Sequence, residues 1–102
     1  MSVPERYEAG LRGEELAEEQ LLAQGMVCLE RRYRAEGGEI DLVMADAAGT
    51  VVFVEVKYRP GGRHGDGLIA VTPDKQRRVC RAADSYLTEH GLWGLPVRYD
   101  IV

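Results

Sequence analysis

The segment Gly38–Lys57 constrains the fold of this 102-residue chain more than any other, because its sequence predicts two strands joined by a tight turn. We expect strands over Glu39–Ala45 and Thr50–Lys57, the second of which is rich in the β-branched residues that suit a pleated sheet. Between them, Asp46–Gly49 supplies turn-forming residues, and Gly49 can adopt a positive φ angle. The segment therefore predicts a pair of neighbouring antiparallel strands.

Both predicted strands carry acidic residues among apolar ones. Side chains alternate between the two faces of a strand, so a three-residue loop would place Asp41 opposite Glu55 and Glu39 opposite Lys57. Residues that face each other in this way have Cβ atoms about 4.5–5.5 Å apart. Two carboxylates at that distance repel each other unless they are protonated or neutralised. A divalent cation, with the amine of Lys57 alongside, would neutralise them.

The combination of Asp41, Glu55 and Lys57 suits metal-assisted hydrolysis of a phosphodiester. Hard cations such as Mg²⁺ or Mn²⁺ bind carboxylate, carbonyl and water oxygens, commonly through one or two carboxylates and a substrate phosphate. Such a cation lowers the pKa of bound water and stabilises the charge that develops on the phosphate, while Lys57 could orient the water or neutralise the phosphate. We expect Asp41 and Glu55 to bind the metal, with Glu14 as a further ligand, direct or through water.

The rest of the sequence completes an α/β pattern that we assign to a single domain over residues 1–102. The other expected elements are a helix from Ser2 to about Gln24, a strand over Met26–Arg34, a helix capped by Thr72 that ends near His90, and a strand over Pro96–Val102. On the first helix, Glu14 falls within the apolar stripe. An acid in that position either reaches past the edge of the stripe to water or has a partner beneath it.

The second helix places a lysine among its buried positions. Its expected apolar stripe consists of Val79, Ala82, Ala83 and Tyr86. Lys75 lies on the same stripe within the first turn, where backbone N–H groups favour anions. The alternative is that its side chain extends past the sheet edge into water. We expect Trp93 to cover the loop that follows this helix.

Charge is distributed unevenly along the chain. The net charge of −4 argues against binding of nucleic acid by overall attraction. Residues 1–30 carry a net charge of −5, however, and residues 57–81 carry +5. A polyanion could therefore bind one positive side of the protein. We expect Arg34, Arg59, Lys75 and Arg78 to contact nucleic acid; the alternative is that these charges only face water.

The cysteines and the apolar runs exclude several other classes of protein. Cys28 and Cys80 stand apart in apolar segments without metal-ligand spacing, so we expect two buried thiols rather than a disulfide or a metal site. No apolar run approaches the ~20 residues that span a bilayer, and the first residues lack the apolar core of a signal peptide. We therefore expect a cytoplasmic protein without membrane association.

Four sequence motifs carry a family resemblance. They are Gly13-Glu14 with Ala17, Gly38-Glu39-Ile40-Asp41-Leu42, Phe53-Val54-Glu55-Val56-Lys57 with Arg59, and Ala70-Val71-Thr72-Pro73 with Lys75. In this order they resemble the YraN-like family of small bacterial proteins. The layout is also similar to the PD-(D/E)xK nuclease superfamily and, within it, to archaeal Holliday-junction resolvases.

The resemblance implies a restriction-endonuclease-like fold, in which helices flank a mixed sheet in the order helix–strand–strand–strand–helix–strand. It also implies that Asp41, Glu55 and Lys57 form the catalytic core and that Glu14 is the helical acid. Some positions depart from the family pattern: Arg32 stands where Asn is usual, Gln20 replaces an aromatic residue and Gly67 replaces a loop proline.

Three functions follow from these patterns. The first is a Mg²⁺- or Mn²⁺-dependent endonuclease that cuts DNA, with branched recombination and repair intermediates as candidate substrates. The second is a nucleic-acid-binding or partner-recruiting module that keeps the nuclease fold without cutting. The third is a small α/β domain whose acids are only structural. One subunit offers one site, so cutting both strands of a duplex would require a homodimer or two encounters.

Overall fold

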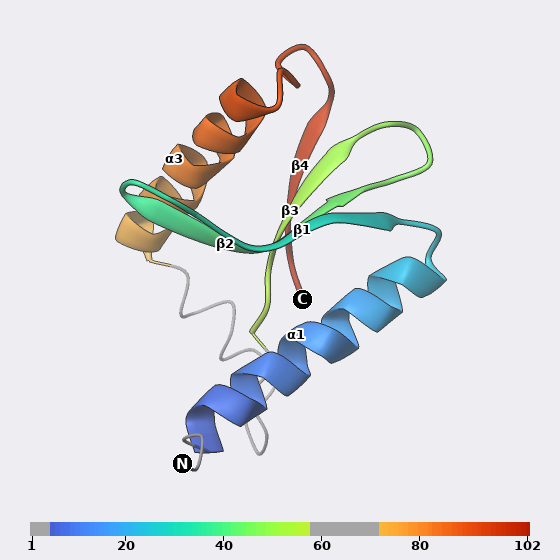
Figure 1. Cartoon of the computed structure of the whole chain (residues 1–102), viewed down its shortest axis with the longest axis vertical. Helices are drawn as coiled ribbons and strands as arrows, with labels where there is room; N and C mark the ends of the chain where they lie inside the picture. Colours follow the sequence, from blue (N-terminus) through green and yellow to red (C-terminus); the bar gives the residue numbers. More distant parts are fainter. Residues whose placement is uncertain (1–4, 58–71) are drawn as a thin grey trace.

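The computed structural model describes residues 5–57 and 72–102, and for residues 5–11 it describes the backbone alone. In these ranges a four-stranded sheet lies between two helices (Figure 1). The elements are α1 (Glu5–Ala23), β1 (Val27–Ala35), β2 (Gly38–Ala45), β3 (Val51–Glu55), α3 (Pro73–Glu89) and β4 (Val97–Ile101). Their order is the predicted one, and the fold is the restriction-endonuclease-like α/β fold expected from the sequence.

The sheet is mixed, with the strand order β1-β2-β3-β4. β1 pairs antiparallel with β2, and β2 with β3, whereas β4 runs parallel to β3 after the chain has passed through α3. The turn after β2 forms as predicted, since one carboxylate oxygen of Asp46 accepts the N–H groups of Ala48 and Thr50 at 3.0 and 2.9 Å. Gly49 completes this turn with a φ of 85°.

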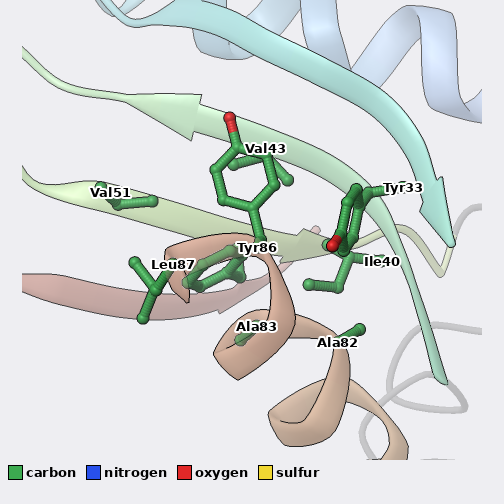
Figure 2. Close-up of a cluster of buried hydrophobic side chains, with 9 residues drawn as sticks. Tyr33, Ile40, Val43, Val51, Ala82, Ala83, Tyr86 and Leu87 are labelled. Atoms are coloured by element: carbon green, nitrogen blue, oxygen red, sulfur yellow. The ribbon is translucent and has the colours of Figure 1, made fainter. Parts of the chain in front are cut away.

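Each face of the sheet packs against one helix. The cluster beneath α3 consists of Tyr33, Ile40, Val43, Val51, Phe53, Ala82, Ala83, Tyr86 and Leu87, most of which Figure 2 labels. The cluster beneath α1 consists of Ala17, Leu21, Met26, Leu42, Met44, Val52 and Val54. The predicted α3 stripe is confirmed, with Leu87 added and Val79 only partly buried. β2 and β3 are covered on both faces, and they are the strands that carry the predicted acids.

Several details differ from the sequence-based expectations. β3 ends at Glu55, two residues earlier than predicted, although the N–H of Lys57 still donates to the carbonyl of Val102 at 2.7 Å. Cys80 is exposed and Cys28 half-buried, so the expectation of two buried thiols is wrong. Trp93 is 59% exposed and its indole N–H donates to the hydroxyl of Thr88, so it does not seal a loop. Neither of the helices in the described ranges is long and apolar enough to cross a membrane.

Candidate active site

The β2–β3 hairpin brings the two predicted metal-binding acids to adjacent positions. The paired residues run from Ala45 opposite Val51 to Leu42 opposite Val54, which is the predicted register. Asp41 and Glu55 are the next residues along the same two strands. The two carboxylates therefore lie at the end of the hairpin ladder, close enough for the charge of Asp41 to raise the pKa of Glu55.

The two carboxylates are held in different ways. One oxygen of Asp41 accepts the backbone N–H of Val56 at 2.8 Å, which fixes the orientation of this half-buried side chain. Glu55 is only 8% exposed and is the one charged residue in the buried core of the described ranges. Its carboxylate faces the amine of Lys75, with Nζ and Oε2 3.3 Å apart. A buried carboxylate needs such a partner, because an isolated ionised group is strongly disfavoured in an apolar environment.

Lys75 reaches Glu55 because the start of α3 is fixed over β2. The hydroxyl of Thr72 accepts the N–H of Lys75 at 3.2 Å, and Pro73 occupies the first turn, so the helix begins where its sequence predicts. The backbone of α3 then passes so close to Gly38 that an added Cβ there would lie 1.9 Å from the carbonyl oxygen of Arg78. A glycine at the start of β2 therefore permits the close approach that positions Lys75.

The pKa shifts show that two acids and two amines interact at this point. Burial raises the pKa of Glu55, the charge of Asp41 raises it further, and Lys75 opposes the shift. Burial also lowers the pKa of Lys57 to about 8, and a hydrogen bond and like charge from Lys75 act in the same direction. For Lys75, partial burial opposes the charged form, but Lys57 and the carboxylates of Glu55 and Asp41 together raise its pKa. Opposite charges thus converge where β2, β3 and α3 meet.

A pocket of about 360 Å³ opens beside these residues. Its lining combines the hairpin acids with the first turns of α3 and consists of Glu39, Asp41, Glu55, Thr72, Asp74, Lys75, Arg78 and Val79. Most of these side chains are polar or charged, so the pocket suits a charged ligand rather than an apolar one. Its size admits a phosphate group with coordinated water.

Glu14 does not join the pocket in the described residues. Its carboxylate instead accepts from the Nε of Arg32 at 2.7 Å, with both side chains partly buried. Of the two sequence-based alternatives for this acid, the structure shows the one with a partner beneath the helix. Among the side chains that the structure describes, in residues 12–57 and 72–102, no three of His, Cys, Asp or Glu are grouped closely enough to hold a metal ion. A role of Glu14 as a metal ligand therefore remains a prediction.

Arg32 also marks an irregularity in the sheet beside Asp41. It has a φ of 51°, a conformation that non-glycine residues adopt infrequently. Its neighbours in β1 pair with Leu42 and Ile40, the residues on either side of Asp41. Leu42 packs beneath α1 but Ile40 packs beneath α3, so the regular alternation of β2 is broken at this point. Asp41 thus lies at a local distortion of the hairpin.

The predicted nucleic-acid contacts have different surroundings. Lys75 and Arg78 both line the pocket. Arg34 lies on β1, is largely exposed and pairs with Glu39 at 3.6 Å. Arg59 lies outside the described residues. The basic side chains nearest the acids therefore come from the first turns of α3.

The structure gives Lys75 a contact that the sequence analysis did not predict, since Lys75 was expected only to contact nucleic acid. In the folded chain it is the direct partner of Glu55. Two signals in the sequence pointed toward this role, namely the Thr72-Pro73 helix start and the place of Lys75 on the buried stripe of α3. For Glu14 the sequence offered a partner beneath the helix as one alternative, but nothing in it identified Arg32 as that partner.

The element order and the mixed four-stranded sheet define a restriction-endonuclease-like α/β domain. Comparison with known proteins then gives the family, since residues 13–102 match the model of the uncharacterised protein family UPF0102. The chain belongs to this family, which confirms the resemblance to YraN-like proteins.

Bacterial relatives support the assignment. A UPF0102 protein of Methylococcus capsulatus is 47% identical over 93 residues, covering 91% of this chain and 74% of the relative. One of Alkalilimnicola ehrlichii is 47% identical over 96 residues, covering 93% of this chain and 75% of the relative. One of Mycolicibacterium smegmatis is 45% identical over 103 residues, covering 100% of this chain and 83% of the relative.

Proposed function

We propose that this domain is an endonuclease that hydrolyses phosphodiester bonds of DNA with the help of Mg²⁺ or Mn²⁺. The observation that carries the proposal is the convergence of the Asp41 and Glu55 carboxylates beside the amines of Lys57 and Lys75. Of these groups, Asp41, Glu55 and Lys75 line a polar pocket large enough for a phosphate. Branched recombination and repair intermediates are the substrates that the resolvase resemblance favours.

The residues present fit a hard divalent cation. Asp41 and Glu55 would hold it, since Mg²⁺ is commonly bound through one or two carboxylates together with water and substrate phosphate. Burial is the larger cause of the raised pKa of Glu55, and repulsion from Asp41 raises it further; a cation between the two carboxylates would remove that repulsion. When bound, such a cation lowers the pKa of water and stabilises negative charge on the phosphate.

The lysines supply the remaining electrostatics. Lys57 is connected through the backbone to both β3 and the chain end, because its N–H donates to Val102 and the N–H of Val102 donates to Glu55. This connection fixes the backbone of Lys57, and its amine interacts with the charges of Glu55 and Asp41, where it can orient a water molecule or a phosphate oxygen. Lys75 neutralises Glu55 without a ligand and can pair with substrate phosphate when a cation takes its place. Arg78, one turn further along α3, extends the positive surface toward the DNA backbone.

A nuclease assay on the Lys57→Ala variant tests the proposal. We expect wild-type protein to cut DNA with Mn²⁺ or Mg²⁺, and to stop cutting when the metal is chelated. The variant should lose at least about 100-fold in rate, as enzymes do when a positioned electrostatic group is removed, while its circular dichroism and DNA affinity stay unchanged. The substrate panel should include a four-way junction, a flap, linear duplex and RNA.

A matched pair of acid substitutions provides the control. Asp41→Asn removes one carboxylate charge at the site, whereas Asp84→Asn makes the same change on the exposed face of α3. We expect the first variant to lose cleavage and the second to retain it. Equal cleavage by wild-type protein and the Lys57→Ala variant, purified in the same way, would assign the activity to a contaminant and refute the proposal.

A second function is supported by the ion pairs themselves. Glu55 is occupied by Lys75, and Glu14 by Arg32, so both acids already have cationic partners in the described structure. This arrangement fits a nucleic-acid-binding module that retains the nuclease fold without cutting. Such a module would bind DNA with an affinity that falls steeply with salt and does not depend on metal, and it would show no turnover.

A further inference from the structure

The outer edge of β4 has backbone groups available for pairing. β4 is the last strand in the order of the sheet, so within residues 5–57 and 72–102 no strand covers its other side. The side of β4 that faces β3 is identified by two hydrogen bonds. The N–H of Val51 donates to the carbonyl of Pro96, and the N–H of Val102 donates to the carbonyl of Glu55. Backbone groups alternate in direction along a parallel strand, so Val97, Tyr99 and Ile101 point theirs outward.

The same three residues also carry exposed apolar side chains. The exposed fractions of Val97, Tyr99 and Ile101 are 37%, 51% and 43%. Trp93 and Leu95, which directly precede β4, are 59% and 45% exposed. An edge strand with open backbone groups and apolar side chains is a template for pairing with another strand, and proteins usually protect such an edge with charges, a bulge or a covering segment. Here the edge fits a partner.

The sequence of β4 identifies that partner by its charge pattern. The strand reads Val97-Arg98-Tyr99-Asp100-Ile101, which has aliphatic residues at both ends, opposite charges within, and an aromatic residue at the centre. If a second copy pairs antiparallel about Tyr99, Arg98 of each copy faces Asp100 of the other. Val97 then faces Ile101 in the same way. A shift by two residues in either direction would instead place Arg98 opposite Arg98, or Asp100 opposite Asp100, which is unfavourable.

The backbone geometry agrees with this register. Residues 97, 99 and 101 direct their N–H and C=O groups outward, so each can exchange a pair of hydrogen bonds with its counterpart. The charged residues then fall at the intervening positions without hydrogen bonds, where facing side chains are closest. In a single copy Arg98 binds its own Asp100 at 3.0 Å and lies 3.8 Å from Asp46. The same guanidinium can therefore serve Asp100 of the second copy.

We propose that β4 pairs antiparallel with β4 of a second copy of this chain, so that one sheet continues through a two-fold symmetric dimer. The interface does not depend on the proposed nuclease activity. It would place two acid–lysine sites in one particle, because Glu55 lies beside Ile101 at one end of β4. The two-fold axis through Tyr99 then puts the sites at opposite ends of the interface, facing the same side of the shared sheet.

Charge-reversal variants test the register. Arg98→Asp makes the edge doubly acidic, and Asp100→Arg makes it doubly basic. For each variant alone, the dissociation constant of the dimer should be at least about tenfold higher than for wild type, because two attractive cross-strand pairs become repulsive. An equimolar mixture of the two should recover the dimer as a heterodimer. Sedimentation equilibrium measures association, and Arg77→Asp on exposed α3 is the matched control that should leave it unchanged.

A second measurement keeps the test valid if either variant fails to fold. Amide hydrogen exchange of wild-type protein should show protection of residues 97, 99 and 101 that falls on dilution, whereas the amides of Arg98, Asp100 and Val102 stay protected within the monomer. A wild-type protein that remains monomeric at millimolar concentration would overturn the proposal. The proposal would also be overturned by a dimer whose charge-reversal variants associate as wild type does and whose amides at residues 97, 99 and 101 exchange at the same rate at every protein concentration. Such a dimer would have its interface elsewhere.

Discussion

Gly38→Ala tests whether the close approach of α3 to β2 holds the site together. The added Cβ would lie 1.9, 2.7 and 3.2 Å from the carbonyl oxygen, carbonyl carbon and Cα of Arg78. All three atoms belong to the helix backbone, so no side-chain rotation can relieve the contact. Restoring ordinary nonbonded distances would require a shift of α3 by about 1.5 Å. The same shift would carry Lys75 away from Glu55, which it now contacts at 3.3 Å.

Two opposing effects set the size of the change. Alanine in place of glycine within a strand gains about 0.5–1 kcal/mol from the smaller entropy of the unfolded chain. Overpacking a core contact costs about 1–3 kcal/mol, and occasionally more. Because the clash at Gly38 is with rigid backbone, we place its cost at the upper end of that range. The expected net loss in the free energy of unfolding is about 2 kcal/mol, or roughly 10 °C in melting temperature for a domain of this size.

Urea denaturation of wild type, Gly38→Ala and Gly49→Ala separates the contact from backbone strain. At Gly49 an added Cβ would meet nothing within 4 Å, so that variant reports only the cost of its φ of 85°. Gly38 has no positive φ, so its variant reports the contact without backbone strain, and the gain from the smaller entropy of the unfolded chain applies to both variants. A Gly38→Ala protein that is as stable as wild type, or more stable, would refute the inference that α3 is fixed by this approach.

Two further predictions concern β1. Arg32→Asn should bind Mn²⁺ several-fold more tightly in calorimetric titration, because it releases Glu14 from its ion pair and because Asn tolerates the φ of 51°; unchanged affinity would exclude Glu14 as a ligand. Tyr33 donates to Glu89 at 2.9 Å, and burial, the larger cause, together with this bond raises its pKa to about 12. The phenol ionises near pH 10 in the unfolded chain, so its stabilising effect is complete below about pH 10 and is lost as pH rises toward 12. Tyr33→Phe should cost about 1 kcal/mol at pH 7 and reduce this alkaline loss in denaturation curves; an unchanged pH dependence would contradict the assignment.

The features that could be predicted from the sequence are those set by residues close together along the chain. The turn at Asp46–Gly49, the Thr72 cap and the buried stripe of α3 each follow from side chains a few residues apart. The hairpin register follows as well, because a slip by one residue would move every apolar side chain of β2 and β3 to the other face. These features were sufficient to predict that Asp41 and Glu55 lie close together.

The partners of charged side chains could not be predicted in the same way. Arg32 binds Glu14 across 18 positions of sequence, and Lys75 binds Glu55 across 20, through elements whose distance is set only when the core packs. Burial was equally uncertain for single residues near the chain end. Trp93 is apolar in sequence yet mostly exposed, since no described element covers the loop in which it lies.

The sequence by itself determined that Asp41 and Glu55 lie close together, because the turn and the apolar residues of β2 and β3 set the register of the hairpin. Only the tertiary structure decided how those charges are balanced. The approach of α3 at Gly38 brings Lys75 to Glu55, and the distorted hairpin brings Arg32 to Glu14. Ion pairs between separate elements depend on how those elements dock, and docking is fixed by the packed core rather than by any local pattern.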